Sequence, residues 1–234
     1  MTNVGNSFGL PFRDPEWFSK FLVTGLIFLI PIVGWINLTG WMLATLDNYR
    51  QGRVELPPAG FHYIGRGANV FVVGLLYALA IAAVLLVPMG LVVLAAMGSQ
   101  LSTPAAPYAG APPSAFGALA PLWGGGGMLV GIVGYIFMPA VIINTERGGI
   151  GGGLNVGAVW QMAAASWKNS LVAGLLIYAA YFIGGFGIYA CCVGIIVSYP
   201  YATAVVAGIL RYYEASFEAT PYVAPTAGPP TTAV

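Results

Sequence analysis

The residues of this sequence that could carry chemistry are few. His62 is the single histidine of the 234-residue chain, and Glu55 is the one carboxylate near it. Such a pair could ligate a metal or a pigment, or act as a base, but a lone histidine without a nearby cysteine is typical of an interfacial side chain. A serine nucleophile would have no histidine within its own motif. We therefore expect no catalytic residues and predict that the protein is not an enzyme.

Two further patterns resemble binding sites and fail on inspection. Gly148 to Gly153 is rich in glycine, but Leu154 and Val156 occupy the third-glycine positions of a Gly-x-Gly-x-x-Gly loop. We interpret this segment as a hinge in front of a surface helix. Cys191 and Cys192 are adjacent within an apolar run, which argues against a disulfide framework or a zinc site and predicts buried thiols. The sequence predicts no metal and no cofactor.

Composition places the chain in a membrane. Charged residues make up 6% of it and hydrophobic residues 59%, whereas roughly 25% of a typical soluble domain is charged. No charge occurs in residues 67–145 or 169–210, and about 20 apolar residues suffice to cross a bilayer. The net charge of +1 offers no basic face for nucleic acid. We therefore predict an integral membrane protein in contact with a lipid bilayer.

Ionisable residues inside a membrane would mark an ion or proton pathway. This sequence has none there, because Asp47, Glu146, Lys168 and Arg211 all lie at the ends of apolar runs. The pattern argues against an ion pump or a proton-coupled transporter. A pathway could still be lined by backbone and by polar side chains, namely Asn37, Thr39, Thr45 and Asn144.

A short phrase occurs three times, as KFLVTGLI in residues 20–27, NVFVVGLL in 69–76 and NSLVAGLL in 169–176. Each copy opens a long apolar run, which predicts three pseudo-repeated helical hairpins entered from the same side. A glycine holds the sixth position of every copy, where it would let helices approach closely. The predicted helix-packing glycines are Gly25, Gly74, Gly127, Gly131 and Gly174.

The predicted fold is an all-α integral membrane protein, with four long transmembrane helices and a kinked or re-entrant N-terminal hairpin. As one span, the first apolar run, 21–46, would be about 39 Å long at 1.5 Å per residue, and as two limbs turning at Pro31 each would be short. Both alternatives stay open. The predicted segments are a flexible N-terminus (1–10), hairpins (about 20–47, 68–145 with an extracytoplasmic loop at 98–123, and 169–211), amphipathic interfacial helices (11–20 and 154–168) and a Pro/Thr/Ala-rich tail (215–234).

Three hairpins would place all eight basic residues on one side of the membrane. The acidic residues would lie on the same side. The positive-inside rule makes that side cytoplasmic, together with both termini, in the cytoplasmic (inner) membrane. Basic and aromatic residues near the run ends are predicted to anchor the protein at the membrane interface. They are Trp17, Lys20, Arg50, Arg53, Arg66, Arg147, Trp160, Trp167, Lys168 and Arg211.

Aromatic, glycine and proline residues flank the apolar runs at Trp17, Gly40, Trp41, Leu56, Pro57 and Gly67. Together with the interfacial helix before the last run, they resemble the domain of unknown function 4013 family of multi-spanning prokaryotic membrane proteins. The resemblance covers most of residues 12–213. Pro58, Ala59 and the long proline-rich connection 98–123 depart from the family pattern. The family brings no established activity, so the resemblance implies an architecture and no chemistry.

We expect a non-enzymatic multi-pass membrane protein, an accessory or scaffold subunit that packs against partner membrane proteins or lipids. The alternative is a permease for a small or lipidic solute, with a path between the hairpins. A cavity at mid-membrane depth lined by Asn37, Thr39 or Asn144 would favour the permease.

Overall fold

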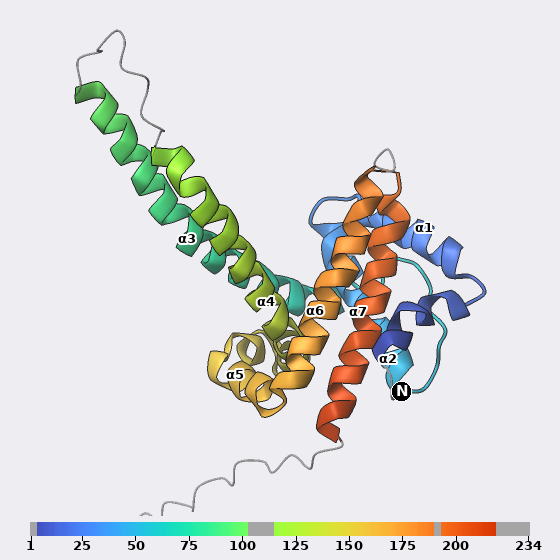
Figure 1. Ribbon diagram of the computed structural model, residues 1–234. Coiled ribbons are helices and arrows are strands. Elements are labelled where there is room, and N and C mark those ends of the chain that lie inside the picture. Colours follow the sequence, from blue (N-terminus) through green and yellow to red (C-terminus); the bar gives the residue numbers. More distant parts are fainter. Residues whose placement is uncertain (1–3, 103–114, 190–192, 219–234) are drawn as a thin grey trace, which may run out of the picture.

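The computed structural model describes residues 4–102, 115–189 and 193–218, and these residues fold as helices joined by short turns and one longer loop (Figure 1). The predicted all-helical fold is confirmed over this part of the chain. The helices are η1 (Val4–Phe8), η2 (Leu10–Arg13), α1 (Trp17–Phe28), α2 (Val33–Arg50), α3 (Ile64–Ser102), α4 (Ala115–Leu154), α5 (Val156–Ala165), α6 (Trp167–Gly185), η3 (Phe186–Tyr189) and α7 (Ile195–Glu218).

Four stretches of the described chain are long and apolar enough to cross a membrane: Ile64–Val87, Leu129–Leu154, Trp167–Tyr189 and Ile195–Phe217. They lie in α3, α4, α6 and α7. Each has at least 23 residues, more than the roughly 20 that the hydrocarbon core requires. The four long apolar helices expected of a membrane protein are therefore present.

The first apolar run divides into two helices at Pro31. Helix α1 ends at Phe28, α2 starts at Val33, and Ile32 between them takes a positive φ of 65°. With 12 residues, α1 is about 18 Å long, well short of the roughly 30 Å of the hydrocarbon core. The structure thus favours two short limbs over a single span kinked at Pro31.

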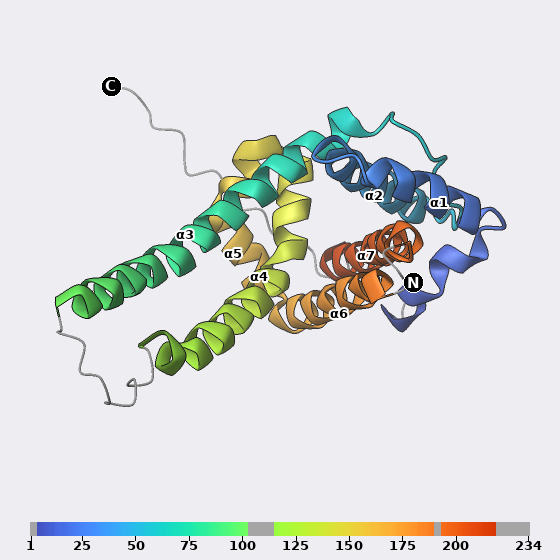
Figure 2. The same ribbon diagram turned by 90° about the horizontal axis from the view of Figure 1, so that it is seen from above.

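Helix α7 lies at the centre of the bundle, against α1, α2 and α6 (Figure 2). Its inner positions carry small side chains that are wholly buried, among them Ala202, Ala204 and Ala207. Small residues allow helices to approach closely in a membrane. Larger buried side chains from α2, α4 and α6, such as Leu46, Ile143 and Ile177, complete the core.

Residues 4–10 pack against α7. The hydroxyl of Tyr201 donates a hydrogen bond to the carbonyl of Phe8 at 3.1 Å, and Ser7 and Leu10 are each 3% exposed. Within the N-terminus predicted to be flexible, residues 4–10 therefore have contacts with a distant helix. The predicted interfacial helix 11–20 is also divided, since η2 ends at Arg13 and α1 begins at Trp17.

Helices α3 and α4 form an arm whose upper halves lean away from α6 and α7 (Figure 1). With 39 residues, α3 is about 58 Å long. Helix covers 98–102 and 115–123, so the connection expected at 98–123 is shorter, and Pro121 lies within α4. Proline is tolerated in membrane helices because neighbouring groups can satisfy the freed carbonyl. The remaining connection, 103–114, and the tail from 219 lie outside the described residues.

The glycine hinge predicted at 148–153 redirects the chain at the end of α4. Gly149 takes φ 61° and ψ −155° there, a combination open essentially to glycine alone. The chain then enters α5, whose N-terminus is capped by Asn155, since its side chain accepts a hydrogen bond from the Ala158 N–H at 3.1 Å. The helix expected at 154–168 is interrupted at Ser166, where α6 takes over.

Candidate functional site

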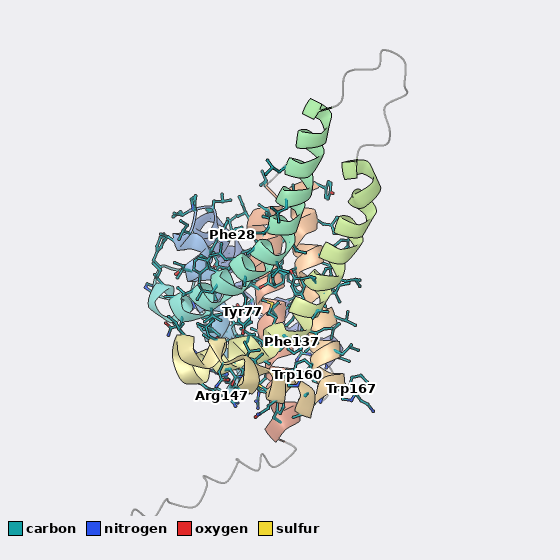
Figure 3. The ribbon with its side chains drawn as sticks, turned by 90° about the vertical axis from the view of Figure 1, so that its left-hand side faces the viewer. Phe28, Tyr77, Phe137, Arg147, Trp160 and Trp167 are labelled. Carbon is teal, nitrogen blue, oxygen red and sulfur yellow. The ribbon has the colours of Figure 1, made fainter. Side chains whose placement is uncertain are left out.

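An apolar groove of about 990 Å³ lies between the arm and the remaining helices. Helix α3 contributes Val70, Gly74 and Tyr77 to its wall, and residues of α2, α4, α5, α6 and α7, with Phe28 of α1, complete it. Figure 3 faces this side of the molecule and labels four lining residues, Phe28, Tyr77, Phe137 and Trp160. The volume is that of a small-molecule site, and no charged side chain of the described residues lines it.

The polar residues considered for a transport path behave differently from one another. Thr39 lines the groove, and its hydroxyl donates to the carbonyl of Trp35 at 2.9 Å. Asn37 is 1% exposed and donates to the carbonyl of Gly60 at 2.9 Å. Thr45 and Asn144 donate to carbonyls of their own helices at 2.9 Å each. Of these four residues, Thr39 alone therefore lines the groove.

The predicted packing glycines divide into two groups. A Cβ at Gly25 would lie 1.7 Å from a backbone oxygen of α7, and one at Gly174 would lie 2.5 Å from the backbone of α4. Both positions thus bring helices into direct backbone contact. A Cβ at Gly74 or Gly131 would meet nothing within 4 Å, and both residues line the groove. Gly127 lies in α4, where the structure describes the backbone but not the surroundings of side chains.

Another close glycine contact, one that the sequence did not predict, joins α2 to the start of α3. A Cβ at Gly40 would lie 2.0 Å from the carbonyl oxygen of Tyr63, and one at Gly67 would lie 1.9 Å from that of Ile36. The two helices therefore cross at a pair of glycines. The sequence did mark both residues, as flanking features of apolar runs.

An ionic cluster centred on Arg50 ties together α2, α3, α4 and α7. The guanidinium of Arg50 donates to Glu214 (Nε–Oε2, 2.9 Å), to Glu146 (Nη2–Oε2, 2.7 Å) and to Asp47 (Nη1–Oδ1, 2.9 Å). Arg66 of α3 donates to Asp47 and, at 2.7 Å, to Glu146. Glu214 is only 5% exposed. Charge-assisted bonds of this kind are strong, and their planar fork geometry is specific to arginine.

The ionic cluster shifts the pKa values of Asp47 and Arg50. Burial acts to raise the pKa of Asp47, but hydrogen bonds from Arg66 and Arg50 outweigh it and hold that pKa below its usual value. The hydrogen bonds with Glu214 raise the pKa of Arg50 despite burial. Asp47 and Arg50 are therefore held in their charged forms, and we refer to the cluster as the ionic clamp because it joins four helices.

A second tie involves Asp14, which is 1% exposed. Its Oδ2 accepts hydrogen bonds from Lys20 Nζ and from the Leu56 N–H, both at 2.7 Å, and its Oδ1 accepts from the Glu16 N–H at 2.7 Å. Burial acts to raise its pKa, but the bonds from Lys20 and the two backbone groups prevail and lower the pKa below 3.8. Asp14 thus fixes the start of α1 to the loop before α3.

Asp14→Asn is expected to lower the free energy of unfolding at pH 7 by about 1–3 kcal/mol, because Lys20 and the two N–H groups lose an ionised acceptor. The folded pKa lies below the unfolded value, so the stabilisation is present above about pH 4 and is lost as pH falls through the folded pKa. Thermal unfolding in detergent between pH 3 and 7 measures both effects. Glu16→Gln is the matched control, since Glu16 lies 3.7 Å from Lys20 but is 72% exposed. Equal losses in the two variants would contradict the tie.

The residues predicted as interface anchors fall into three environments. Arg50, Arg66 and Lys20 are engaged by carboxylates, and Arg211 reaches Glu214 at 4.0 Å, so these four act within the protein. Trp17 packs edge-on against the rings of its neighbours. The remainder are exposed, and for them the anchoring role stays a prediction: Arg53, Arg147, Trp160, Trp167 and Lys168.

The structure gives His62 and Glu55, the pair considered for a catalytic or metal site, the following surroundings. His62 is exposed, with its ring beside that of Tyr63 at 5.9 Å between centroids. Glu55 uses its backbone carbonyl to accept from Asn48. Within the described residues, no group of three His, Cys, Asp or Glu side chains could hold a metal ion. Cys191 and Cys192 lie outside the described residues.

These features define an all-helical membrane protein with a lateral apolar groove and an ionic clamp at one end. Residues 23–193 match the family described as "Protein of unknown function (DUF4013)". The chain belongs to this family, which confirms the resemblance seen in the sequence. No curated protein and no solved structure matches the chain.

Proposed function

We propose that this protein is a non-enzymatic, multi-pass protein of the cytoplasmic membrane that holds a hydrophobic molecule of the bilayer in the groove. The observation that carries the proposal is the groove itself, about 990 Å³ in volume and lined mainly by apolar side chains of the membrane helices. Sites for small molecules have this size and this apolar character. A lipid chain or another apolar molecule is the occupant available at that depth.

The lining supports binding without catalysis. No Asp, Glu, His, Lys, Arg or Cys among the described residues lines the groove, so general acid-base chemistry would have to rely on hydroxyl groups alone. Five of the charged residues are engaged at the ionic clamp instead, namely Asp47, Arg50, Arg66, Glu146 and Glu214. We place this clamp and both termini on the cytoplasmic side, following the one-sided basic residues.

Filling the groove is expected to expel its occupant. Gly74 and Gly134 line it from α3 and α4, and a Cβ at either would meet nothing within 4 Å. The double variant Gly74→Leu, Gly134→Leu should therefore fold and lose the bound molecule. Native mass spectrometry of protein purified from its membrane in mild detergent measures the retained mass. We expect a lipid-sized adduct on the wild type and at least a tenfold lower fraction of it on the variant.

Gly90→Leu is the matched control, because Gly90 is an exposed glycine of α3 with open space around it and lies outside the groove. Equal adducts on all three proteins would overturn the proposal. A co-purifying protein chain, lost from the groove-filling variant alone, would instead indicate the accessory or scaffold role. Release of the adduct to the opposite leaflet of reconstituted vesicles would favour the permease.

A further inference from the structure

Three tyrosines from three helices meet on the wall of the groove. Tyr135 of α4, Tyr181 of α6 and Tyr199 of α7 all line it. The ring centroid of Tyr181 lies 6.2 Å from that of Tyr135 and 5.7 Å from that of Tyr199. Three tyrosine rings are thus neighbours in a site that is otherwise largely apolar. We refer to these residues as the tyrosine trio.

The trio differs from the other hydroxyl groups of the groove in having no partner within the described chain. Thr39 donates to the carbonyl of Trp35, Thr203 donates to that of Tyr199, and Tyr77 donates to that of Gly153. No hydrogen bond joins a trio hydroxyl to another described residue. A polar group in an apolar medium is costly unless it is hydrogen-bonded. A bound molecule would therefore gain from meeting these hydroxyls.

The trio hydroxyls are also reachable. The side-chain oxygens that are sealed from the surface and lack a partner are those of Thr24, Tyr49 and Ser166, among the described residues. The trio oxygens are not in that group, so they keep accessible surface while lacking a hydrogen bond. They can therefore donate hydrogen bonds to an acceptor group of a molecule that enters the groove.

The depth of the trio restricts what can enter. Tyr135 lies eleven residues before Glu146, and Tyr199 lies twelve before Arg211, which places them about 16–18 Å along their helices from the charged end. Tyr181 lies thirteen residues after Lys168, or about 20 Å away. The hydrocarbon core is about 30 Å thick, so the trio lies near its middle. A charged lipid headgroup is unsuited to this depth.

We propose that the tyrosine trio binds a carbonyl oxygen of a neutral, membrane-dissolved molecule with a long apolar tail, such as a long-tailed quinone. A phenol donates a hydrogen bond, and one carbonyl oxygen has two lone pairs that can accept from two phenols together. The apolar tail would lie along the remainder of the groove. This inference rests on the proposed function, and it names the class of molecule that the groove takes.

The test uses a benzoquinone with a decyl tail, titrated into the full-length protein in detergent. Quinones quench indole fluorescence, and Trp35 and Trp160 line the groove, so saturable quenching reports binding. A triple variant in which phenylalanine replaces Tyr135, Tyr181 and Tyr199 should have a dissociation constant at least tenfold higher. This is the effect of losing one or more hydrogen bonds. Tyr178→Phe is the control, because its ring lies 5.4 Å from that of Tyr135 but does not line the groove.

Decylbenzene has an apolar tail but no carbonyl, so it distinguishes the contribution of the trio hydroxyls to binding from that of the apolar groove. It should compete with the quinone weakly in the wild type and bind equally well to the wild type and the triple variant. Equal quinone affinity in the wild type and the triple variant would overturn the role of the trio and leave the groove in place. Absence of saturable binding of both probes to the wild type would overturn the proposed function as well. If the triple variant does not fold, Tyr181→Phe alone is compared, with at least a threefold loss expected.

Discussion

Arg50→Met is expected to lower the free energy of unfolding by about 3–5 kcal/mol, the cost of leaving a buried carboxylate without its partner. Glu214 is 5% exposed, and Arg50 donates two hydrogen bonds to it. The substitution removes both bonds to this buried carboxylate, leaves Arg211 at 4.0 Å beside it, and also removes both bonds from Arg50 to Glu146. Helices α2, α4 and α7 would lose their common link. Thermal or denaturant unfolding in detergent, followed by circular dichroism, measures the loss.

Arg53→Gln is the matched control for Arg50→Met. Arg53 lies three residues further along, is exposed, and has the side-chain amide of Gln51 as its partner, so its loss should stay within about 0.5 kcal/mol. Adding Glu214→Gln to Arg50→Met should recover part of the stability, because the amide carries no buried charge. If Arg50→Met is as stable as Arg53→Gln, the clamp does not contribute to folding.

The ionic clamp shows what the sequence could and could not provide. Predicted hairpins place the basic residues on one side, and the acidic residues follow them there, although the positive-inside rule does not require it. The shared location of basic and acidic residues is the signal in the sequence that ion pairs form there. The sequence places Asp47 and Glu146 only at the ends of apolar runs, because the partners of Arg50 are up to 164 positions away and no local pattern identifies them.

Membrane class and helix content could be predicted because both depend on local composition. Long charge-free runs fix the helices that cross, and Pro31 marks the division of the first run. The groove could not be predicted, because six helices and the last residue of α1 supply its walls. Tyr135 and Tyr181 lie inside apolar runs without any periodic signal, so their convergence follows only from how α4 and α6 pack.

The N-terminal segment illustrates the same limit at smaller scale. Residues 1–10 are polar and contain glycine, which is typical of a loose end. Gly208 of α7 nevertheless leaves room for Ser7, whose Cβ would lie 3.0 Å from a Cβ at that glycine. Packing against a distant helix, α7, therefore orders a segment that has no strong structural preference of its own.

Gly25→Ala is expected to destabilise the protein by about 1–3 kcal/mol or more, since overpacking forces side chains and backbone to shift. The added Cβ would lie 1.7 Å from a backbone oxygen of α7, and a backbone group cannot rotate away as a side chain can. Helix α1 must therefore move off α7. The free energy of unfolding in detergent measures the effect.

Gly74→Ala and Gly174→Ala complete this comparison, because the three glycines occupy the same position of the repeated phrase. The structure gives Gly74 open space and Gly174 a contact of 2.5 Å with the backbone of α4. We expect Gly74→Ala to change stability by less than about 0.5 kcal/mol and Gly174→Ala to destabilise as Gly25→Ala does. Equal destabilisation by all three would show that Gly74 has a packing contact outside the described residues or with a partner. Equal tolerance of all three would contradict the close contacts of α1 with α7 and of α6 with α4.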